Sequence, residues 1–256
     1  IIEEQLHGAL DRNEFEVVYQ PKIDLADLKI MGAEALLRWN NPALGSVSPS
    51  EFIPIAEQTG IIVNIGKYVL TEAISAANNW HKNLGRDLNI AVNLSPRQFR
   101  DADLVPFIGR TIDEYGIDGH CLEVEITEGM FLSGYQHVNE SLAQLNALGV
   151  NISMDDFGTG YSSLNYLRKY PFDMLKVDRS YIVNMTNEGT GKELVIASIA
   201  MAHSLNLKVI AEGVETKEQL DLLIDMGCDY AQGYLFSKPV PRHALEGLLV
   251  DNVDWY

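Results

Sequence analysis

Two adjacent aspartates have residue types and a spacing that could do chemistry. Asp155 and Asp156 end the run VNISMDD and precede FGTGYSS, a segment with two glycines and several hydroxyls. Because aspartate and glycine both favour turns, a solvated turn is the ordinary explanation of a lone DD-x-G segment. The alternative is a metal site, in which one carboxylate bridges two cations and its neighbour binds the second.

Polar residues also stand at or near the ends of other β-rich runs. Each has an ordinary explanation: Glu125 as a solvent-facing strand residue, Asn93 as a helix cap or turn, Lys176 as a surface lysine. Their recurrence at the ends of successive runs is harder to explain in that way. The residues are Glu34, Arg38, Asn93, Glu125, Glu128, Asp155, Asp156, Lys176, Asp178, Glu212, Glu215 and Gln232.

The elements that must position these residues alternate along the chain. The β-rich runs are 15–23, 29–39, 88–95, 121–127, 150–156, 172–178, 207–213 and 229–236, and helical patterns include 65–84, 134–148, 191–205 and 216–226. Such alternation over about 250 residues predicts an α/β fold, a TIM-type (β/α)8 barrel. An open doubly wound sheet is the second choice, because no glycine-rich phosphate-binding segment follows the first strand.

The first connection predicts a modification of this barrel. Only DLADL, residues 24–28, separates the first two runs. A parallel crossover needs a dozen residues or more, so these two strands are expected to form an antiparallel hairpin. In a TIM barrel the chemistry lies at the carboxyl ends of the strands, so the polar residues should meet at one mouth.

The types of these residues favour a hard cation. Carboxylate and amide oxygens suit Mg²⁺ or Mn²⁺, and the set contains neither the histidine nor the cysteine typical of zinc sites. Carboxylates crowded at one mouth would repel one another unless divalent cations lay among them. Paired cations are a common device for cleaving phosphodiesters. The oxygen ligands are Glu34, Asn93, Glu125, Asp155, Asp156 and Glu212.

Composition restricts the partners. The chain has 256 residues, 46% of them hydrophobic, and its 19 basic and 36 acidic residues give a net charge of −17. Long-range repulsion therefore argues against nucleic acid polymers, whereas a phosphate-bearing ligand needs cations to neutralise it locally. Cys121 and Cys228 lack metal-site spacing, and two thiols without a disulfide framework indicate a reducing compartment.

The sequence predicts one domain, 1–256, taken from a longer protein. The first residues, IIEEQLHGAL, read as the middle of an amphipathic helix, expected over 1–13 and continuing from an upstream region. No apolar stretch approaches the ~18–20 residues that span a bilayer, so we expect no membrane contact by the domain itself. We expect a cytoplasmic location for this domain, whether or not the full-length protein is anchored in a membrane.

Several motifs give the chain a resemblance to a known family over nearly its whole length. They include FEVVYQPKID, GAEALLRW, SPSEFIPIAEQTG, AVNLSPRQF, EVEITE, DDFGTGYSSL, LKVD, IAEGVET and QGYLFSKP. The chain resembles an EAL domain, the bacterial phosphodiesterase module that acts on cyclic di-GMP. The resemblance implies hydrolysis of one ester bond to give linear 5′-pGpG, with two Mg²⁺ or Mn²⁺ ions in each active site.

The resemblance also implies a role for each matching residue. Glu34, Asn93, Glu125 and Asp155 would bind one metal, and Asp155 with Asp156 the second. Lys176 would contact the attacking water or the phosphate, and Glu212 would be the general base or a second-metal ligand. The nucleotide would be held by Gln20, Leu36 and Arg38, and we expect Asp178, Glu215 and Gln232 to join them.

Glu128 is expected to brace the loop DDFGTGYSS, which in this family helps to organise the metal site and the dimer interface. A homodimer and an upstream regulatory or sensory domain are the partners that the resemblance implies. Gly129 replaces the serine or threonine that many members carry after the glutamate pair, but no ligand is lost with it.

Two other classes of function compete with a phosphodiesterase. A silent receptor would bind cyclic di-GMP without cutting it, but such receptors usually lack motif residues that are present here. A barrel glycosidase would use paired carboxylates. That mechanism gives no reason for Asn93, Lys176 and an adjacent aspartate pair at one rim.

Overall fold

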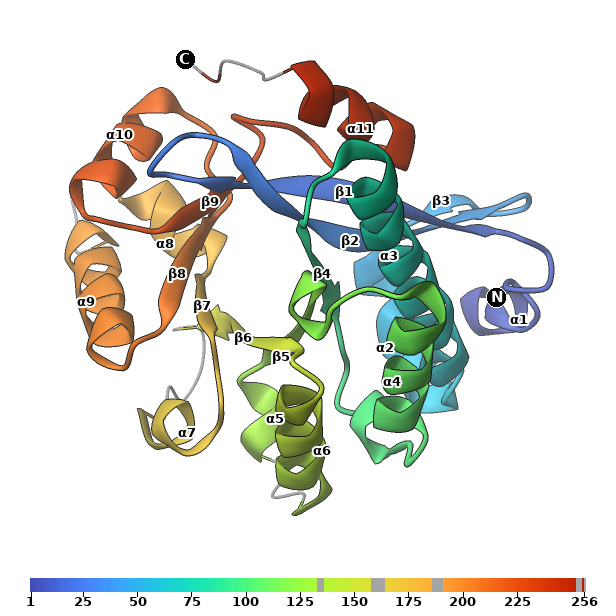
Figure 1. Ribbon diagram of the computed structural model, residues 1–256. Coiled ribbons are helices and arrows are strands. Elements are labelled where there is room, and N and C mark those ends of the chain that lie inside the picture. The colour runs from blue at the N-terminus through green and yellow to red at the C-terminus, as the bar shows by residue number, and fades with distance from the viewer. Residues whose placement is uncertain (133–135, 158–163, 186–190, 252–254, 256) are drawn as a thin grey trace.

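A closed barrel forms the centre of the computed structural model, which describes residues 1–132, 136–157, 164–185, 191–251 and 255. The sheet order is β1-β9-β8-β7-β6-β5-β4-β2-β3, and a further pairing of β1 with β2 closes the ring (Figure 1). The short strand β3 extends β2 outside the ring. The strands are β1 (Phe15–Asp24), β2 (Ile30–Asn41), β3 (Gly45–Val47), β4 (Asn89–Asn93), β5 (Leu122–Thr127), β6 (Asn151–Phe157), β7 (Met174–Val177), β8 (Lys208–Glu212) and β9 (Tyr230–Gln232).

The first strand runs against its neighbours. β1 pairs antiparallel with both β2 and β9, whereas the pairs from β2–β4 through β8–β9 are parallel. The predicted barrel with an antiparallel first pair is therefore confirmed, and the open doubly wound alternative is wrong because the sheet closes. The cause is the short connection between β1 and β2, which leaves no room for a crossover.

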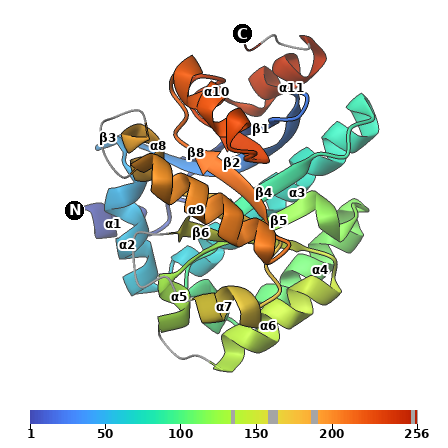
Figure 2. The ribbon, with the colours of Figure 1, turned by 90° about the vertical axis from the view of Figure 1, so that its left-hand side faces the viewer.

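Helices surround the barrel on its outside (Figure 1, Figure 2). α8 and α9 pack side by side, and α11 packs against β1. The helices are α1 (Ile2–Leu6), α2 (Pro49–Thr59), α3 (Ile62–Leu84), α4 (Leu104–Tyr115), α5 (Gly129–Leu132), α6 (Gln136–Ala147), α7 (Leu164–Lys169), α8 (Arg179–Asn184), α9 (Gly191–Ser204), α10 (Lys217–Asp225) and α11 (Arg242–Asp251), with 3₁₀ turns η1 (Gln98–Arg100) and η2 (Gly119–Cys121). Among the described residues, no helix combines the length and apolarity that crossing a membrane requires.

Helix α3 illustrates why the sequence forms this outer layer. Its apolar residues recur at helical spacing and are buried, including Ile65, Leu70 and Ile74. The ring of Trp80 meets Tyr19 of β1 edge to face at 5.8 Å. Full burial of such side chains contributes roughly 1.5–3 kcal/mol each. The helix ends where Gly85 adopts the left-handed conformation, φ 60°.

The amino-terminal helix is shorter than predicted. The pattern over 1–13 predicts one helix, but α1 ends at Leu6 and the chain turns through Gly8 at φ 73°. Hydrogen bonds of the following segment favour this turn. Arg12 donates to Glu14 Oε1 at 2.5 Å, and Glu14 Oε2 accepts from Trp39 Nε1 at 2.9 Å. The Trp39 bond joins Glu14, the residue before β1, to β2, whereas the Arg12 bond is local to residues 12–14.

Candidate active site

The polar ends of the strands meet at one mouth of the barrel because of the sheet register. Asn93 pairs with Glu125, and Glu212 with Gln232. On the antiparallel side, Gln20 of β1 lies opposite Glu34 of β2. Successive residues of a strand alternate between faces, so residues two apart share the barrel interior.

Lys176 of β7 lies at the centre of this group and is 1% exposed. Its Nζ lies 2.5 Å from Oε2 of Glu125 and 2.8 Å from Oε1 of Glu212. Asp155 Oδ1 is 3.3 Å away and Glu34 Oε1 4.0 Å away. Four carboxylates from four strands thus converge on one ammonium group. The surface-lysine explanation is wrong for Lys176.

Amide groups hold the carboxylate of Glu34 from the other side. Asn93 Nδ2 donates to Glu34 Oε1, and Gln232 Nε2 donates to Glu34 Oε2, both at 2.7 Å. Gln232 also donates to Gln20 Oε1 at 3.0 Å, and Gln20 donates to the carbonyl of Ser237. Glu34 is therefore fixed by β4 and β9 as well as by its own strand.

The two adjacent aspartates are separated by a local irregularity of β6. The pairing with β7 shifts register between Met154 and Phe157, and Asp156 adopts the left-handed conformation at φ 56°. The backbone N–H of Asp156 donates to Asp155 Oδ1 at 2.9 Å. Asp155 is brought to Lys176, while Asp156 is exposed. The irregularity directs the two neighbouring carboxylates to different surroundings.

The electrostatics of the mouth follow from burial among like charges. Burial raises the pKa of Glu212 to about 8, although the Lys176 ammonium opposes this shift. Burial, followed by the charge of Glu125, also raises the pKa of Glu34. The pKa of Lys176 lies well above its ordinary value because the surrounding carboxylates outweigh its own desolvation.

A second buried lysine was missed by sequence reasoning. Lys22 of β1 is fully buried, and its Nζ contacts Glu125 Oε1 at 2.9 Å and Glu123 Oε1 at 3.1 Å. The available signal was spacing: Lys22 stands two residues after Gln20, and Glu123 two before Glu125. At the period of a strand both positions face the barrel interior.

A cavity of about 270 Å³ opens beside Lys176 and Glu212. Of the expected substrate contacts, Gln20, Leu36, Glu215 and Gln232 line it. Arg179 lines it too and donates to Glu215 at 2.6 Å, a residue that sequence reasoning did not single out. The signal for it was its place directly after the LKVD segment.

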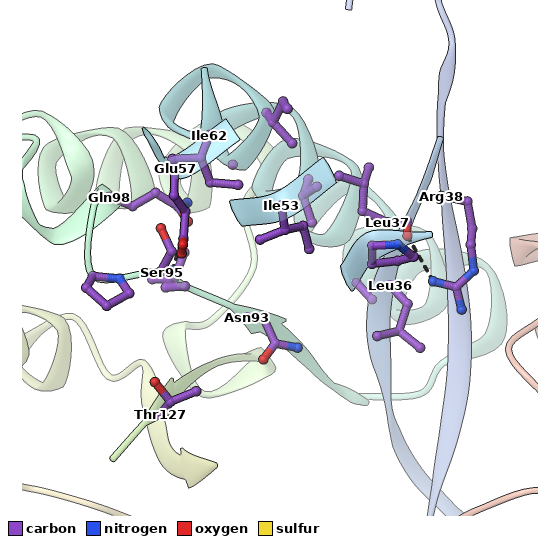
Figure 3. A pocket seen from close by; sticks show the side chains of 17 residues that line it. Leu36, Leu37, Arg38, Ile53, Glu57, Ile62, Asn93, Ser95, Gln98 and Thr127 are labelled. Carbon is purple, nitrogen blue, oxygen red and sulfur yellow. Dashed lines mark hydrogen bonds between the residues drawn. The ribbon is translucent and has the colours of Figure 1, made fainter. Parts of the chain in front are cut away.

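Arg38 and Asn93 line a neighbouring cavity of about 300 Å³, with Leu36 common to both cavities (Figure 3). Arg38 donates to the carbonyl of Leu37 at 2.9 Å. Apolar side chains of α2 and α3, such as Ile53 and Ile62, form the opposite wall. Asp178 instead caps α8, where its carboxylate accepts from the backbone and hydroxyl of Ser180.

Glu128 is buried directly after β5, at 5% exposure. Gly129 begins the short helix α5. The loop that Glu128 is expected to brace continues through 158–163, which lies outside the described residues. Its bracing role therefore stays a prediction.

The donor set fits a hard divalent cation by its chemistry, because carboxylate and amide oxygens gather there. Within the described ranges, no three acidic, histidine or cysteine side chains are already arranged around a common point as a cation site. The carboxylates are directed at Lys176 instead. Acidic groups outnumber the two buried lysines, so net negative charge remains for cations to balance.

Comparison with known proteins identifies the family. The profile of the EAL domain matches residues 3–239. The chain belongs to the EAL domain family, which confirms the resemblance seen in the sequence.

Relatives share the domain within longer chains. The chain is 42% identical over 246 residues to Signaling protein YkoW of Bacillus subtilis, covering 96% of this chain and 31% of that protein. It is 41% identical over 240 residues to the bifunctional diguanylate cyclase/cyclic di-GMP phosphodiesterase MucR of Pseudomonas aeruginosa, covering 94% and 35%. The chain thus spans about a third of the length of the curated relatives it matches.

A solved structure has the same fold. The PaMucR phosphodiesterase in complex with c-di-GMP superposes with a TM-score of 0.90 at 40% identity, covering 95% of this chain and 99% of that one. The likeness therefore extends over nearly the whole of both chains.

Proposed function

We propose that this domain hydrolyses one ester bond of cyclic di-GMP and releases linear 5′-pGpG, using two Mg²⁺ or Mn²⁺ ions. The observation that carries the proposal is the convergence of four carboxylates on Lys176 at the mouth of an EAL-family barrel. The printed names of relatives that act on cyclic di-GMP support the choice of substrate.

In this proposal the chain's own carboxylate and amide oxygens hold the cations. Glu34, Asn93, Glu125 and Asp155 surround the first, and Asp155 with the exposed Asp156 reaches the second. Paired cations would activate a water molecule and stabilise the leaving oxygen. Asp155 lies beside Lys176 while Asp156 is exposed. This difference suits an Asp155 carboxylate shared by two cations better than it suits a solvated turn.

Glu212 is the proposed general base. It lines the cavity that would receive the phosphate, and burial raises its pKa to about 8. A carboxylate with a pKa near the working pH is an efficient proton acceptor. Lys176, 2.8 Å away, remains a cation and would orient the phosphate or the attacking water.

The two neighbouring cavities are proposed to hold the nucleotide. Leu36 lies between them, with Gln20, Glu215 and Gln232 on one side and Arg38 on the other. Arg38 suits phosphate oxygens because its planar guanidinium donates two parallel hydrogen bonds. Asp178, at the start of α8, would also contact the nucleotide. Bound cations would offset the chain's net charge of −17 toward an anionic substrate.

Around this domain we further propose a longer cytoplasmic signalling protein with an upstream regulatory domain, and a homodimer of the barrel. The length of the relatives supports the first part. The dimer rests on the family resemblance.

The test is to incubate the purified chain with cyclic di-GMP and Mg²⁺ and to separate the products by chromatography. Appearance of pGpG, suppressed by EDTA, supports the proposal. Tight binding without product would instead identify a silent receptor. Absence of both binding and product would remove cyclic di-GMP as the ligand.

A further inference from the structure

A fully buried lysine pairs with one of the proposed metal ligands. Lys22 of β1 crosses the interior to β5, where its Nζ contacts Glu123 and Glu125 at 3.1 and 2.9 Å. It is fully buried, and Glu123 and Glu125 are each 1% exposed. Lys22 is not among the residues that line the cavity beside Lys176. It therefore acts from the closed side of the mouth.

The carboxylate of Glu125 has a different ammonium partner on each oxygen. Oε1 accepts from Lys22, and Oε2 accepts from Lys176. Lys176 also contacts Asp155 and Glu212, so its position depends on the whole mouth. Within the part of the chain that the structure describes, both ion pairs of Lys22 are with β5, where Glu123 stands two residues before Glu125. Two bonds at opposite ends of a carboxylate restrict its rotation.

Stability alone is a weak reason for an ion pair at this depth. Desolvating two charges costs as much as their attraction returns, and apolar residues of similar volume are often equally stable. An ion pair can also affect metal binding, because a residue that hydrogen-bonds to a metal-ligating side chain sets the orientation and basicity of that side chain. Lys22 has that relation to Glu125.

We propose that Lys22 is a positioning residue, which holds Oε1 of Glu125 so that its other oxygen stays directed to the mouth and toward a divalent cation. Lys22 touches neither substrate nor metal in this arrangement. The inference rests on the proposed function, in which Glu125 is a metal ligand. It adds that tight binding of a divalent cation requires Lys22 as well as the intact set of ligands at the mouth.

Charge provides a way to separate positioning from simple electrostatics. Removing a nearby positive charge strengthens cation binding through space, whereas loss of positioning weakens it. The double variant Lys22→Met/Glu123→Gln removes one charge of each sign. The matched control is Glu123→Gln alone, which leaves Lys22 on Glu125. Weaker Mn²⁺ binding by the double variant than by this control reports the lost contact of Lys22 with Glu125, because loss of the Lys22 charge alone would act in the opposite direction.

The experiment measures Mn²⁺ binding to the whole purified chain by calorimetry, with melting curves in EDTA to verify folding. We expect Glu123→Gln to bind Mn²⁺ nearly as wild type. The double variant should bind about 10–100-fold more weakly. In hydrolysis assays it should need more Mn²⁺, with kcat approaching that of Glu123→Gln at saturation.

A double variant that binds Mn²⁺ as tightly as folded Glu123→Gln, or more tightly, would overturn the positioning role and leave Lys22 as a space-filling ion pair. If the double variant does not fold, Lys22→Gln/Glu123→Gln replaces it, since the shorter neutral amide also removes the charge-assisted bond. A wild type that binds Mn²⁺ but does not cleave cyclic di-GMP would contradict the proposed function. The Mn²⁺ affinities of the two variants would still test the positioning role of Lys22. A wild type that binds no Mn²⁺ would overturn both.

Discussion

The ammonium of Lys176 and the carboxylate of Glu212 lie 2.8 Å apart at the barrel mouth, on neighbouring strands β7 and β8. The proposed base is thus held by a buried cation that also contacts Glu125 and Asp155. Together with Lys22 on Glu125, this ammonium offsets the mutual repulsion of the mouth carboxylates. Divalent cations would share that task.

Replacing Lys176 by methionine should therefore destabilise the protein most in the absence of metal. Removing one partner of a buried pair costs about 3–5 kcal/mol, and Mg²⁺ should recover part of this loss. Melting curves in EDTA and in Mg²⁺ measure it: the rise in Tm on adding Mg²⁺ should exceed that of wild type. The control is Lys208→Met, which removes a solvent-exposed ammonium paired with the partly buried Asp229, so the loss should be close to the ~0–1 kcal/mol of surface pairs. Equal Mg²⁺-induced shifts in all three proteins would refute this role of Lys176.

Hydrolysis should require Mg²⁺ or Mn²⁺ and should be poorly supported by Ca²⁺. The oxygen ligands fit all three ions, but Mg²⁺ demands tight octahedral geometry at about 2.1 Å, whereas Ca²⁺ takes longer and looser coordination. Product formation is measured after EDTA treatment and readdition of each ion. Full turnover in protein shown to be free of metal would sink the two-metal mechanism.

Glu212→Gln should abolish cleavage while nucleotide binding stays measurable. Glutamine keeps the shape of the side chain but cannot accept the proton, and general-base catalysis contributes typically 10²–10⁴-fold. Arg38→Ala should instead weaken binding, because it removes a contact made before the transition state. Binding is measured by calorimetry and turnover by product chromatography. A wild-type kcat for Glu212→Gln would exclude Glu212 as the base.

Glu128→Ala should cut activity by on the order of ten- to a hundredfold and raise the Mg²⁺ concentration required, with little change in Tm. If Glu128 braces the loop as the family resemblance implies, alanine would remove charge-assisted hydrogen bonds that its carboxylate accepts, each contributing roughly 1.5–3 kcal/mol. Asp155→Ala should be worse, and extra Mg²⁺ should not rescue it because a bridging ligand is gone.

A Mg²⁺ titration of activity compares these two variants with the exposed Glu114→Ala on α4. If Glu128→Ala matched that surface control at every Mg²⁺ concentration, the bracing role would have to be abandoned.

Glu14 should make folding stability depend on pH in acid. Its hydrogen bond from Arg12, together with those from Trp39 and Asn41, lowers its pKa from 4.5 to about 2. The unfolded chain takes up a proton near 4.5 while the folded one stays ionised. The stabilisation is therefore present above that pH and is lost as the pH falls toward 2.

Urea unfolding of wild type and Glu14→Gln across this pH range checks the sign. The difference in midpoint should be constant near neutral pH and should shrink in acid. Glu16→Gln, an exposed neighbour on β1, is the matched control for replacing a carboxylate by an amide. A difference that grew on acidification would contradict the assignment.

Much of the fold could be predicted because it depends on local pattern and chain length. The alternation of strand and helix patterns predicts the barrel, and five residues between the first two strands exclude a parallel crossover. The helix expected over 1–13 was wrong beyond Leu6. Amphipathic spacing there could not anticipate that Glu14 is held by Trp39 and Asn41 from another strand.

The sequence by itself determined which residue types stand at the strand ends, and hence the oxygen-rich, cation-binding chemistry of the mouth. Only the tertiary structure decided the partners within it. Residues 22 and 125 meet because β1 and β5 face each other across a closed ring, a relation that no spacing along the chain encodes. The backbone irregularity at Asp156 likewise separates two carboxylates that are adjacent in sequence. Strand periodicity assigns a side chain to a face, but the order and register of the strands decide which charges share a buried space.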